Sequence, residues 1–231
     1  MQLFEIPLSH TGLEVEKRIK ICVNERIPVL LTGGTGFGKT YFLSRLAGKH
    51  NQRLTKVNQV GASADMVWGM LVAEDKWQDG LLTGCVRRGG WASVEELARI
   101  DQEIQGRLFS LLDFDDPVLS LVEIGENLAP HKDFRFFAST NEGGDYFVRG
   151  IDKALRDRFF VQEWGLDFWE LSVLDQKLGA ALGEKLREML RKSLVTLRKV
   201  VTCINLIEKG IDPKEAWMIG GIGPALEASG G

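Results

Sequence analysis

The sequence is poor in the residues that build a disulfide framework or a zinc site. Its 231 residues include 3 cysteines and 3 histidines. Cys22, Cys85 and Cys203 are odd in number, far apart and without a Cys-x-x-Cys pair, so we expect reduced thiols. The histidines stand alone along the chain, and an isolated histidine is more often a surface or loop residue than a metal ligand. The composition therefore argues against a disulfide-stapled domain and against a zinc site.

The sequence also lacks long apolar runs and an excess of charge of either sign. No stretch approaches the roughly 18 consecutive apolar residues of a membrane span. Residues 1–6 do not combine a basic segment with an apolar core, so we expect a cytoplasmic protein without membrane contact. The net charge of −3 argues against a generally basic nucleic-acid binder, while leaving room for a local basic face.

Apolar residues and glycine are plentiful. With 44% hydrophobic and 26% charged residues, the chain can bury a sizeable core, as one large domain or a medium domain with a small companion. Its 26 glycines exceed the average share of about 7%. They gather at residues 33–38, 89–90, 143–150 and 219–231, which predicts loops and a tail.

One of these glycine clusters, GGTGFGKT at residues 33–40, has the Gly-x-x-x-x-Gly-Lys-Thr spacing of a phosphate-binding loop. An apolar run at 27–31 precedes it, and helically spaced apolar residues at 41–49 follow, so we predict a strand, a loop and a helix. In that context Lys39 can lie between the β- and γ-phosphates of ATP, and the Thr40 hydroxyl can bind Mg²⁺. The residues expected at the nucleotide are Gly33, Gly34, Thr35, Gly36, Phe37, Gly38, Lys39, Thr40 and Tyr41.

A second informative stretch is the short apolar run at residues 91–94, which ends in Glu95 and Glu96. Two carboxylates at the end of a strand suit metal binding by Glu95 and activation of an attacking water by Glu96. Alternatively, the two acids open a helix at residues 97–112, because acidic side chains favour the first turn of a helix. The spacing leaves both interpretations open.

Predicted strands and helices alternate over the first 160 residues. Strands are expected at 27–31, 54–60, 91–96, 118–124, 134–140 and 160–162, and helices at 12–25, 41–49 and 65–72, with a loop or insert at 77–84 and a turn at 125–127. This alternation predicts an α/β fold with a parallel sheet covered by helices on both faces. Later residues read as helices at 171–182, 185–194, 197–207 and 213–218. We therefore expect a nucleotide-binding α/β domain at 1–166, an all-helical domain at 167–225 and a flexible tail at 226–231.

Several polar residues outside these motifs have more than one interpretation. Asn141 directly follows the strand at 134–140, at the carboxyl end where α/β sheets bind ligands. Arg156 and Arg158, taken alone, are expected to pair with Asp152 and Asp157 at the surface. The basic residues of 185–199 alternate with acids, which is typical of a solvated helix face, with nucleic-acid contact as the alternative. Most tryptophans are expected in the core or at subunit contacts; Trp77 is instead a candidate client contact.

Five motifs occur in the order GGTGFGKT, WQDGLLTGCVRRGGW, VEELARID, HKDFRFFASTN and KALRDRF. Their order resembles that of AAA+ ATPases of the MoxR group, including the NorQ and CbbQ types, over residues 15–210. The resemblance implies a P-loop NTPase domain of three αβα layers with a small helical lid. It also implies a helix-2 insert at 77–90 and a hairpin at 118–133, both lining a central pore. The implied site residues are Lys39 of Walker A, Glu95 and Glu96 of Walker B, Asn141 as sensor 1, Arg158 as the arginine finger with Arg156 nearby, and Arg198 as sensor 2.

The same resemblance implies a Mg²⁺-dependent ATPase. An arginine finger acts on the nucleotide of a neighbouring subunit, so we expect a homo-oligomer, a hexamer. The resemblance further implies a client protein that the ring remodels or activates. MoxR-type chaperones often do this together with a von Willebrand A-domain (VWA) partner, sometimes by promoting the insertion of a metal cofactor. A nucleic-acid motor or loader of the AAA+ class is a second hypothesis. Glu95 stands where the family has aspartate, so a nucleotide-binding ring with weak or no hydrolysis is a third.

Overall fold

In a computed structural model the chain folds into two compact units, which we call the sheet unit and the helical unit. The described residues are 4–58, 63–141, 151–223 and 226. The sheet unit consists of Arg18–Gly33 and Lys39–Glu163. The helical unit consists of Met1–Lys17, Gly34–Gly38 and Trp164–Gly231.

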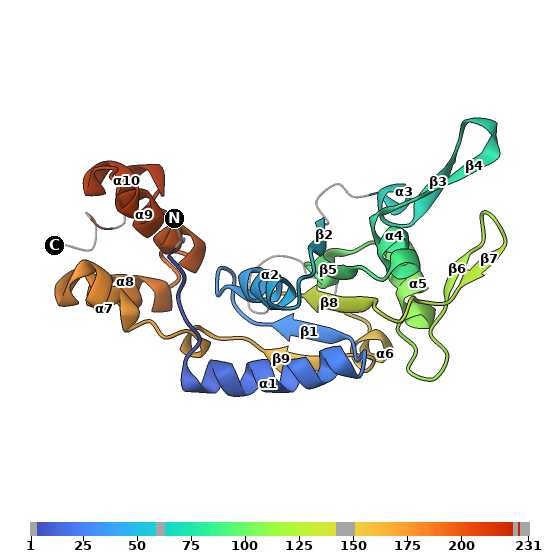
Figure 1. The fold of residues 1–231 in the computed structure, drawn as a ribbon, viewed down its shortest axis with the longest axis horizontal. Helices are drawn as coiled ribbons and strands as arrows, with labels where there is room; N and C mark the ends of the chain where they lie inside the picture. Colours follow the sequence, from blue (N-terminus) through green and yellow to red (C-terminus); the bar gives the residue numbers. More distant parts are fainter. Residues whose placement is uncertain (1–3, 59–62, 142–150, 224–225, 227–231) are drawn as a thin grey trace. The chain divides into compact units, whose positions relative to one another are not determined.

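The sheet unit is built on five parallel strands (Figure 1). In spatial order they are β2 (Leu54–Asn58), β5 (Trp91–Glu95), β8 (Arg135–Ser139), β1 (Val29–Thr32) and β9 (Phe160–Glu163). Every pairing in this sheet is parallel, so the carboxyl ends of the strands share one edge. The loops after β1, β5 and β8 leave from that edge, where open α/β sheets bind ligands. The predicted parallel α/β sheet is confirmed.

Helices cover both faces of this sheet. Leu30, Val94 and Phe136 point to one face and form a continuous buried core with side chains from the helices above them. Trp91 and Phe137 point to the other face, with ring centroids 5.3 Å apart. The helices of the sheet unit are α2 (Lys39–Lys49), α3 (Ala64–Val67), α4 (Leu81–Arg88), α5 (Gln102–Leu111), α6 (Lys153–Arg156) and the end of α1 (His10–Asn24).

Two antiparallel hairpins project beside α4 and α5 (Figure 1). One pairs β3 (Gly69–Val72) with β4 (Lys76–Asp79), and the other pairs β6 (Leu119–Leu121) with β7 (Glu126–Leu128). The helix predicted at 65–72 is therefore wrong beyond Val67, because the chain turns into β3 at a glycine with a φ of 126°.

Two other predictions in this region are also wrong. The loop predicted at 77–84 contains most of β4 and the first turn of α4, since Gly80 only separates these two elements. The turn predicted at 125–127 lies partly inside β7, where Glu126 pairs with Leu121. In both places the pairing of two short strands outweighs the tendency of an isolated glycine to break regular structure.

Arg87 of α4 holds the two hairpins together. Its guanidinium donates to both carboxylate oxygens of Glu126 on β7, at 2.7 and 2.9 Å, and to Asp79 on β4 at 3.0 Å. The hydrogen bond from Arg87 holds the pKa of Glu126 below its usual range. A depressed folded-state pKa means that this stabilisation is present above about pH 4.5 and is lost as the pH falls further.

We expect Arg87→Met to lower the free energy of unfolding by about 1 kcal/mol at pH 7, because the paired side chains are a third exposed and solvent screens them. The difference from the wild type should shrink as the pH falls below about 4.5, because Glu126 then takes up a proton more readily in the unfolded chain than in the folded one. Urea unfolding at pH 7 and pH 3.5 measures both quantities. Lys76→Met is the control, since its pair with Glu74 is largely exposed. Equal losses in the two variants would contradict the prediction.

Besides the start of α1, the described part of the helical unit contains four α-helices. They are α7 (Val173–Leu178), α8 (Ala180–Arg191), α9 (Leu197–Glu208) and α10 (Pro213–Ile219). The helix predicted at 171–182 is two helices, because Gly179 between them has a φ of 84°. The N-terminal segment belongs to this unit, where the Phe4 amide donates to the Asn205 side chain at 2.7 Å. The predicted domain boundary after residue 166 stays a prediction.

In the described ranges no helix is both long enough and apolar enough to cross a bilayer. The glycine-rich loop predicted at 143–150 and most of the predicted tail lie outside the described residues.

Candidate functional site

Three polar side chains of the sheet unit meet at the carboxyl edge of the sheet. Lys39 begins α2, directly after the loop that leaves β1. Glu96 follows the last residue of β5, and Asn141 lies two residues beyond β8. β5, β8 and β1 are adjacent in the sheet, so their loops converge although they are far apart in sequence.

Lys39 is the cation of this group, and its side chain is almost fully buried. Its ammonium donates to the Gly33 carbonyl at 2.8 Å and to the Asn141 side-chain oxygen at 2.8 Å. A buried ammonium needs such acceptors, since desolvation of an unpaired charge is costly. Lys39 is therefore held between Gly33, directly after β1, and Asn141, and phosphate oxygens could replace these two acceptors.

Asn141 links Lys39 to Glu96. While its side-chain oxygen accepts from Lys39, its amide nitrogen donates to a Glu96 carboxylate oxygen. Glu96 has left-handed backbone with a φ of 57°, which turns the chain out of β5. The alternative that Glu95 and Glu96 open a helix at 97–112 holds for one short 3₁₀ helix only, Leu97–Arg99, of which Glu96 is the N-cap. The longer helix, α5, begins at Gln102. Lys39, Asn141 and Glu96 thus form one hydrogen-bonded network.

Glu95, the residue expected to bind metal, ends β5 beside this network. Its Oε1 is buried and has no hydrogen-bond partner among the described residues. A buried carboxylate oxygen without a donor is costly, and a cation or a metal-bound water would satisfy it. The described ranges hold no cluster of three or more His, Cys, Asp or Glu side chains suited to a metal ion. This donor set fits Mg²⁺, which is usually held by one or two protein ligands together with substrate phosphates.

The glycine-rich loop itself needs its glycines. Gly33, Gly36 and Gly38 have φ values of 129°, 81° and 86°, a region that side chains disfavour. A Cβ at Gly36 would lie 2.6 Å from the Thr196 methyl group. The positive φ values explain why glycine occupies these three positions of the loop.

Arg198, the predicted sensor 2, lies exposed in the first turn of α9 in the helical unit. The Leu197 amide, one residue earlier, donates to the Gly36 carbonyl at 3.3 Å. The start of α9 therefore contacts the glycine-rich loop within this unit, and Arg198 follows the contact directly.

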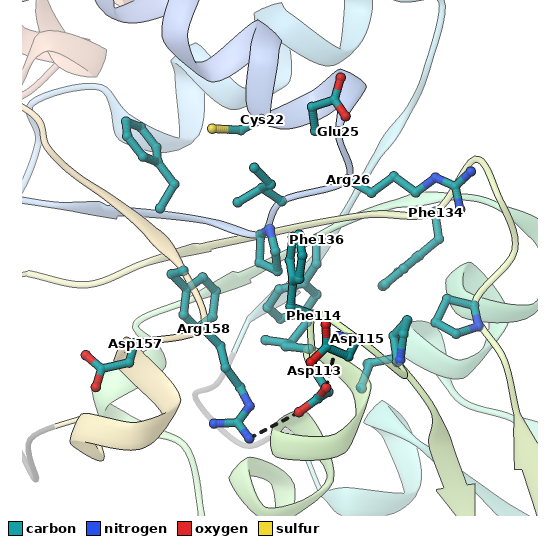
Figure 2. A pocket seen from close by; sticks show the side chains of 18 of the residues that line it. Cys22, Glu25, Arg26, Asp113, Phe114, Asp115, Phe134, Phe136, Asp157 and Arg158 are labelled. Atoms are coloured by element: carbon teal, nitrogen blue, oxygen red, sulfur yellow. Dashed lines mark hydrogen bonds and ion pairs between the residues drawn. The ribbon is translucent and has the colours of Figure 1, made fainter.

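Arg158 is hydrogen-bonded to groups of its own chain. Its Nε donates to the Phe109 carbonyl at 2.9 Å, and Nη1 donates to the Ala154 carbonyl at 2.9 Å. Nη2 lies 3.5 Å from a carboxylate oxygen of Asp113 (Figure 2). The expected pairing of Arg158 with Asp152 or Asp157 is wrong; Asp152 instead caps α6 by accepting from the Ala154 amide.

Asp113 was not anticipated from the sequence. One of its oxygens accepts from the backbone amides of Asp115 and Asp116, so its own loop orients the carboxylate that faces Arg158. Asp113 and Arg158 line a cavity of about 960 Å³ whose walls include Phe134 and Phe136 (Figure 2). The only sequence signal was a run of acids after a helix, which by itself is typical of a solvated loop. Arg156 lies half-buried on α6.

Comparison with known families decides the class of this fold. Residues 28–159, more than half of the chain, match the family described as AAA domain (dynein-related subfamily). The chain belongs to this AAA family. Among relatives of this AAA protein is the denitrification regulatory protein NirQ of Pseudomonas aeruginosa. NirQ is 31% identical over 225 residues, which cover 89% of this chain and 85% of NirQ.

Two further comparisons agree with this family. Protein CbbQ of Hydrogenophilus thermoluteolus is 28% identical over 226 residues, covering 90% of this chain and 84% of CbbQ. The predicted resemblance of this AAA protein to the MoxR group is thereby confirmed. The crystal structure of NtrX from Brucella abortus in complex with ATP has a TM-score of 0.52 at 16% identity. That match covers 71% of this chain and 37% of the NtrX chain, and it concerns the fold alone.

Proposed function

We propose that this chain binds ATP at the loop of residues 33–40 and hydrolyses it with Glu96 as the general base. The observation that carries the proposal is the network from Lys39 through Asn141 to Glu96. It gathers an ammonium, an amide and a carboxylate at the edge where the phosphate-type loop leaves the sheet. Membership of the AAA family supports it, because AAA domains are ATPases.

Each network member has a role in phosphoryl transfer. Lys39 exchanges its present acceptors for β- and γ-phosphate oxygens. Asn141 orients the Glu96 carboxylate, which accepts a proton from water as the water oxygen bonds to the γ-phosphorus. The bond from that phosphorus to the ADP oxygen breaks, and ADP leaves with inorganic phosphate. Mg²⁺, held through Thr40 and Glu95, would neutralise charge on the β- and γ-phosphates.

Removing either the metal or the Lys39 ammonium tests this proposal. We expect phosphate release from ATP in the presence of Mg²⁺ and none with excess EDTA. Lys39→Ala should raise the Kd for ATP by about 10–100-fold, since hydrogen bonds to charged groups are lost. Malachite-green detection and calorimetry measure the two quantities, with the exposed Lys56→Ala as the control. Tight ATP binding without any phosphate release would instead support the nucleotide-binding ring that does not hydrolyse.

The proposal extends to a ring of identical subunits, a hexamer, in which Arg158 serves a neighbour. Arg158 precedes β9 by two residues and therefore lies at the amino edge of the sheet. Lys39 and Glu96 lie at the carboxyl edge, and strands of four or five residues separate the edges by about 13–17 Å. An arginine side chain does not span that distance, so Arg158 suits the nucleotide of another subunit. Arg156 and Arg198 are proposed as further contacts of the phosphates.

We further propose that the ring remodels or activates a client protein, as the name of the regulatory relative NirQ suggests for that protein. The hairpins offer apolar contacts for a client: Met70 and Leu71 on β3 are 46% and 43% exposed, and Val122 between β6 and β7 is 76% exposed. Trp77, the earlier candidate for client contact, is half-buried against the core and donates to Asp79. A VWA-domain partner and metal-cofactor insertion remain part of this proposal.

A further inference from the structure

The carbonyl oxygen of Phe37, inside the glycine-rich loop, accepts two indole hydrogen bonds. Trp164 Nε1 donates to it at 3.0 Å and Trp169 Nε1 donates at 2.8 Å. Both tryptophans are almost fully buried, at 1% and 2% exposure. All three residues belong to the helical unit. A carbonyl oxygen has two lone pairs, so the two indoles use its full accepting capacity.

The indoles also have contacts outside the loop. The Trp164 ring lies edge-on to Phe168 at 5.0 Å and to Trp169 at 5.8 Å between ring centroids. Trp169 also forms a backbone bridge with Leu8 of the N-terminal segment. Such edge-to-face aromatic contacts fix ring orientation. The orientation of the two N–H groups is therefore fixed by contacts outside the loop, and the Phe37 carbonyl accepts hydrogen bonds from both.

Fixing the Phe37 carbonyl also fixes the next amide. In a trans peptide the C=O and the following N–H point in opposite directions, and the described residues contain no cis peptide. Directing the Phe37 oxygen at the indoles therefore directs the Gly38 N–H away from them. A Cβ at Gly38 would lie 2.9 Å from the Trp169 ring, so only glycine allows the indole to come this close.

We propose that Trp164 and Trp169 are positioning residues that hold the glycine-rich loop in its anion-binding form, so that nucleotide affinity depends on their two indole N–H groups. The inference rests on the proposed ATP binding at residues 33–40. Without the indoles the peptide plane between Phe37 and Gly38 is free to rotate, and binding must then restrain it. We expect the loss to fall on binding rather than on the chemical step, because both indole N–H groups donate to the Phe37 carbonyl of the loop.

The test replaces each indole with phenylalanine, which keeps an aromatic ring and removes the N–H. Trp164→Phe and Trp169→Phe should each raise the Kd for ADP by about 3–10-fold, and the double variant by about 10–100-fold. The kcat at saturating ATP should stay within about 2-fold of the wild type while KM rises. Trp217→Phe, buried elsewhere in the helical unit, is the control and should bind ADP normally.

Indole N–H resonances of ¹⁵N-tryptophan-labelled protein give a second readout. The two signals missing from the Phe variants should exchange slowly with solvent and shift when ADP is added. Normal ADP affinity in the double variant, or fast exchange of these signals in the wild type, would overturn the proposal. A double variant that melts well below Trp217→Phe is judged on the exchange rates and on the single variants. No ADP binding by the wild type would overturn the proposed function. Slow exchange of the two indole N–H signals would still support the hydrogen bonds that hold the Phe37 carbonyl.

Discussion

Glu96→Gln should lower the kcat for ATP hydrolysis by about 10²–10⁴-fold while leaving ATP affinity within a few-fold of the wild type. Glutamine keeps an oxygen that can accept from Asn141, as Glu96 does now, so the network geometry survives. It cannot take a proton from the attacking water, because a neutral amide is a very weak base. The variant therefore separates the role of Glu96 in hydrolysis from its role in the hydrogen-bonded network.

Steady-state phosphate release and calorimetric ATP binding measure the two effects of Glu96→Gln. The matched control is Glu103→Gln, an exposed acid in the first turn of α5 in the same unit, which should leave kcat unchanged. Equal kcat values for Glu96→Gln and the wild type would show that Glu96 is not the base. With ATP bound and hydrolysis blocked, this variant is also the form in which a client protein should stay attached to the ring.

Arg158→Ala should lower kcat by about 10³–10⁵-fold, the range found when an arginine finger is lost. The reason is the developing charge on the γ-phosphate, which a guanidinium from the neighbouring subunit would neutralise. To reach a neighbour, Arg158 must exchange part of its present contacts with Phe109, Ala154 and Asp113. Arg156→Ala, at the last residue of α6 and two residues before Arg158, is the comparison that assigns the finger.

Mixing two inactive variants tests action between subunits. A Glu96→Gln subunit has a defective site and an intact finger, whereas an Arg158→Ala subunit has the reverse. In rings mixed at random from equal amounts, about a quarter of the sites combine both intact halves and should hydrolyse ATP. A mixture of Glu96→Gln with Lys39→Ala should stay inactive, since both changes damage the same half. Failure of the first mixture, with rings present by light scattering, would contradict action in trans.

Several features of the fold could be predicted because they depend on residues close together in the chain. The strand before the loop and the helix after it follow from a local apolar pattern, and β1 and α2 confirm them. The helix at 12–25 is confirmed by α1 for the same reason. The hairpin of β3 and β4 was missed because short strands are stabilised by their partner, and Gly69–Val72 has no strong preference of its own.

The site shows the same division between local and distant information. Spacing and residue type were enough to single out Lys39, whereas the roles of Glu96 and Asn141 were implied by the order of motifs that resembles the MoxR group. Their joining depends on the strand order, which brings Asn141 to a lysine 102 residues earlier and to a glutamate 45 residues earlier. No local pattern contains that information, because a hydrogen bond forms only after the intervening chain has been packed.

The glycine-rich loop illustrates both contributions. The features that suit it to binding phosphate lie within eight consecutive residues, because positive φ at glycine, backbone amides and a lysine are local properties. The two indoles that donate to the Phe37 carbonyl belong to residues 127 and 132 positions later in the chain. Folding must first pay the entropy of closing these long loops, so the core and the sheet order determine which distant side chains reach the site.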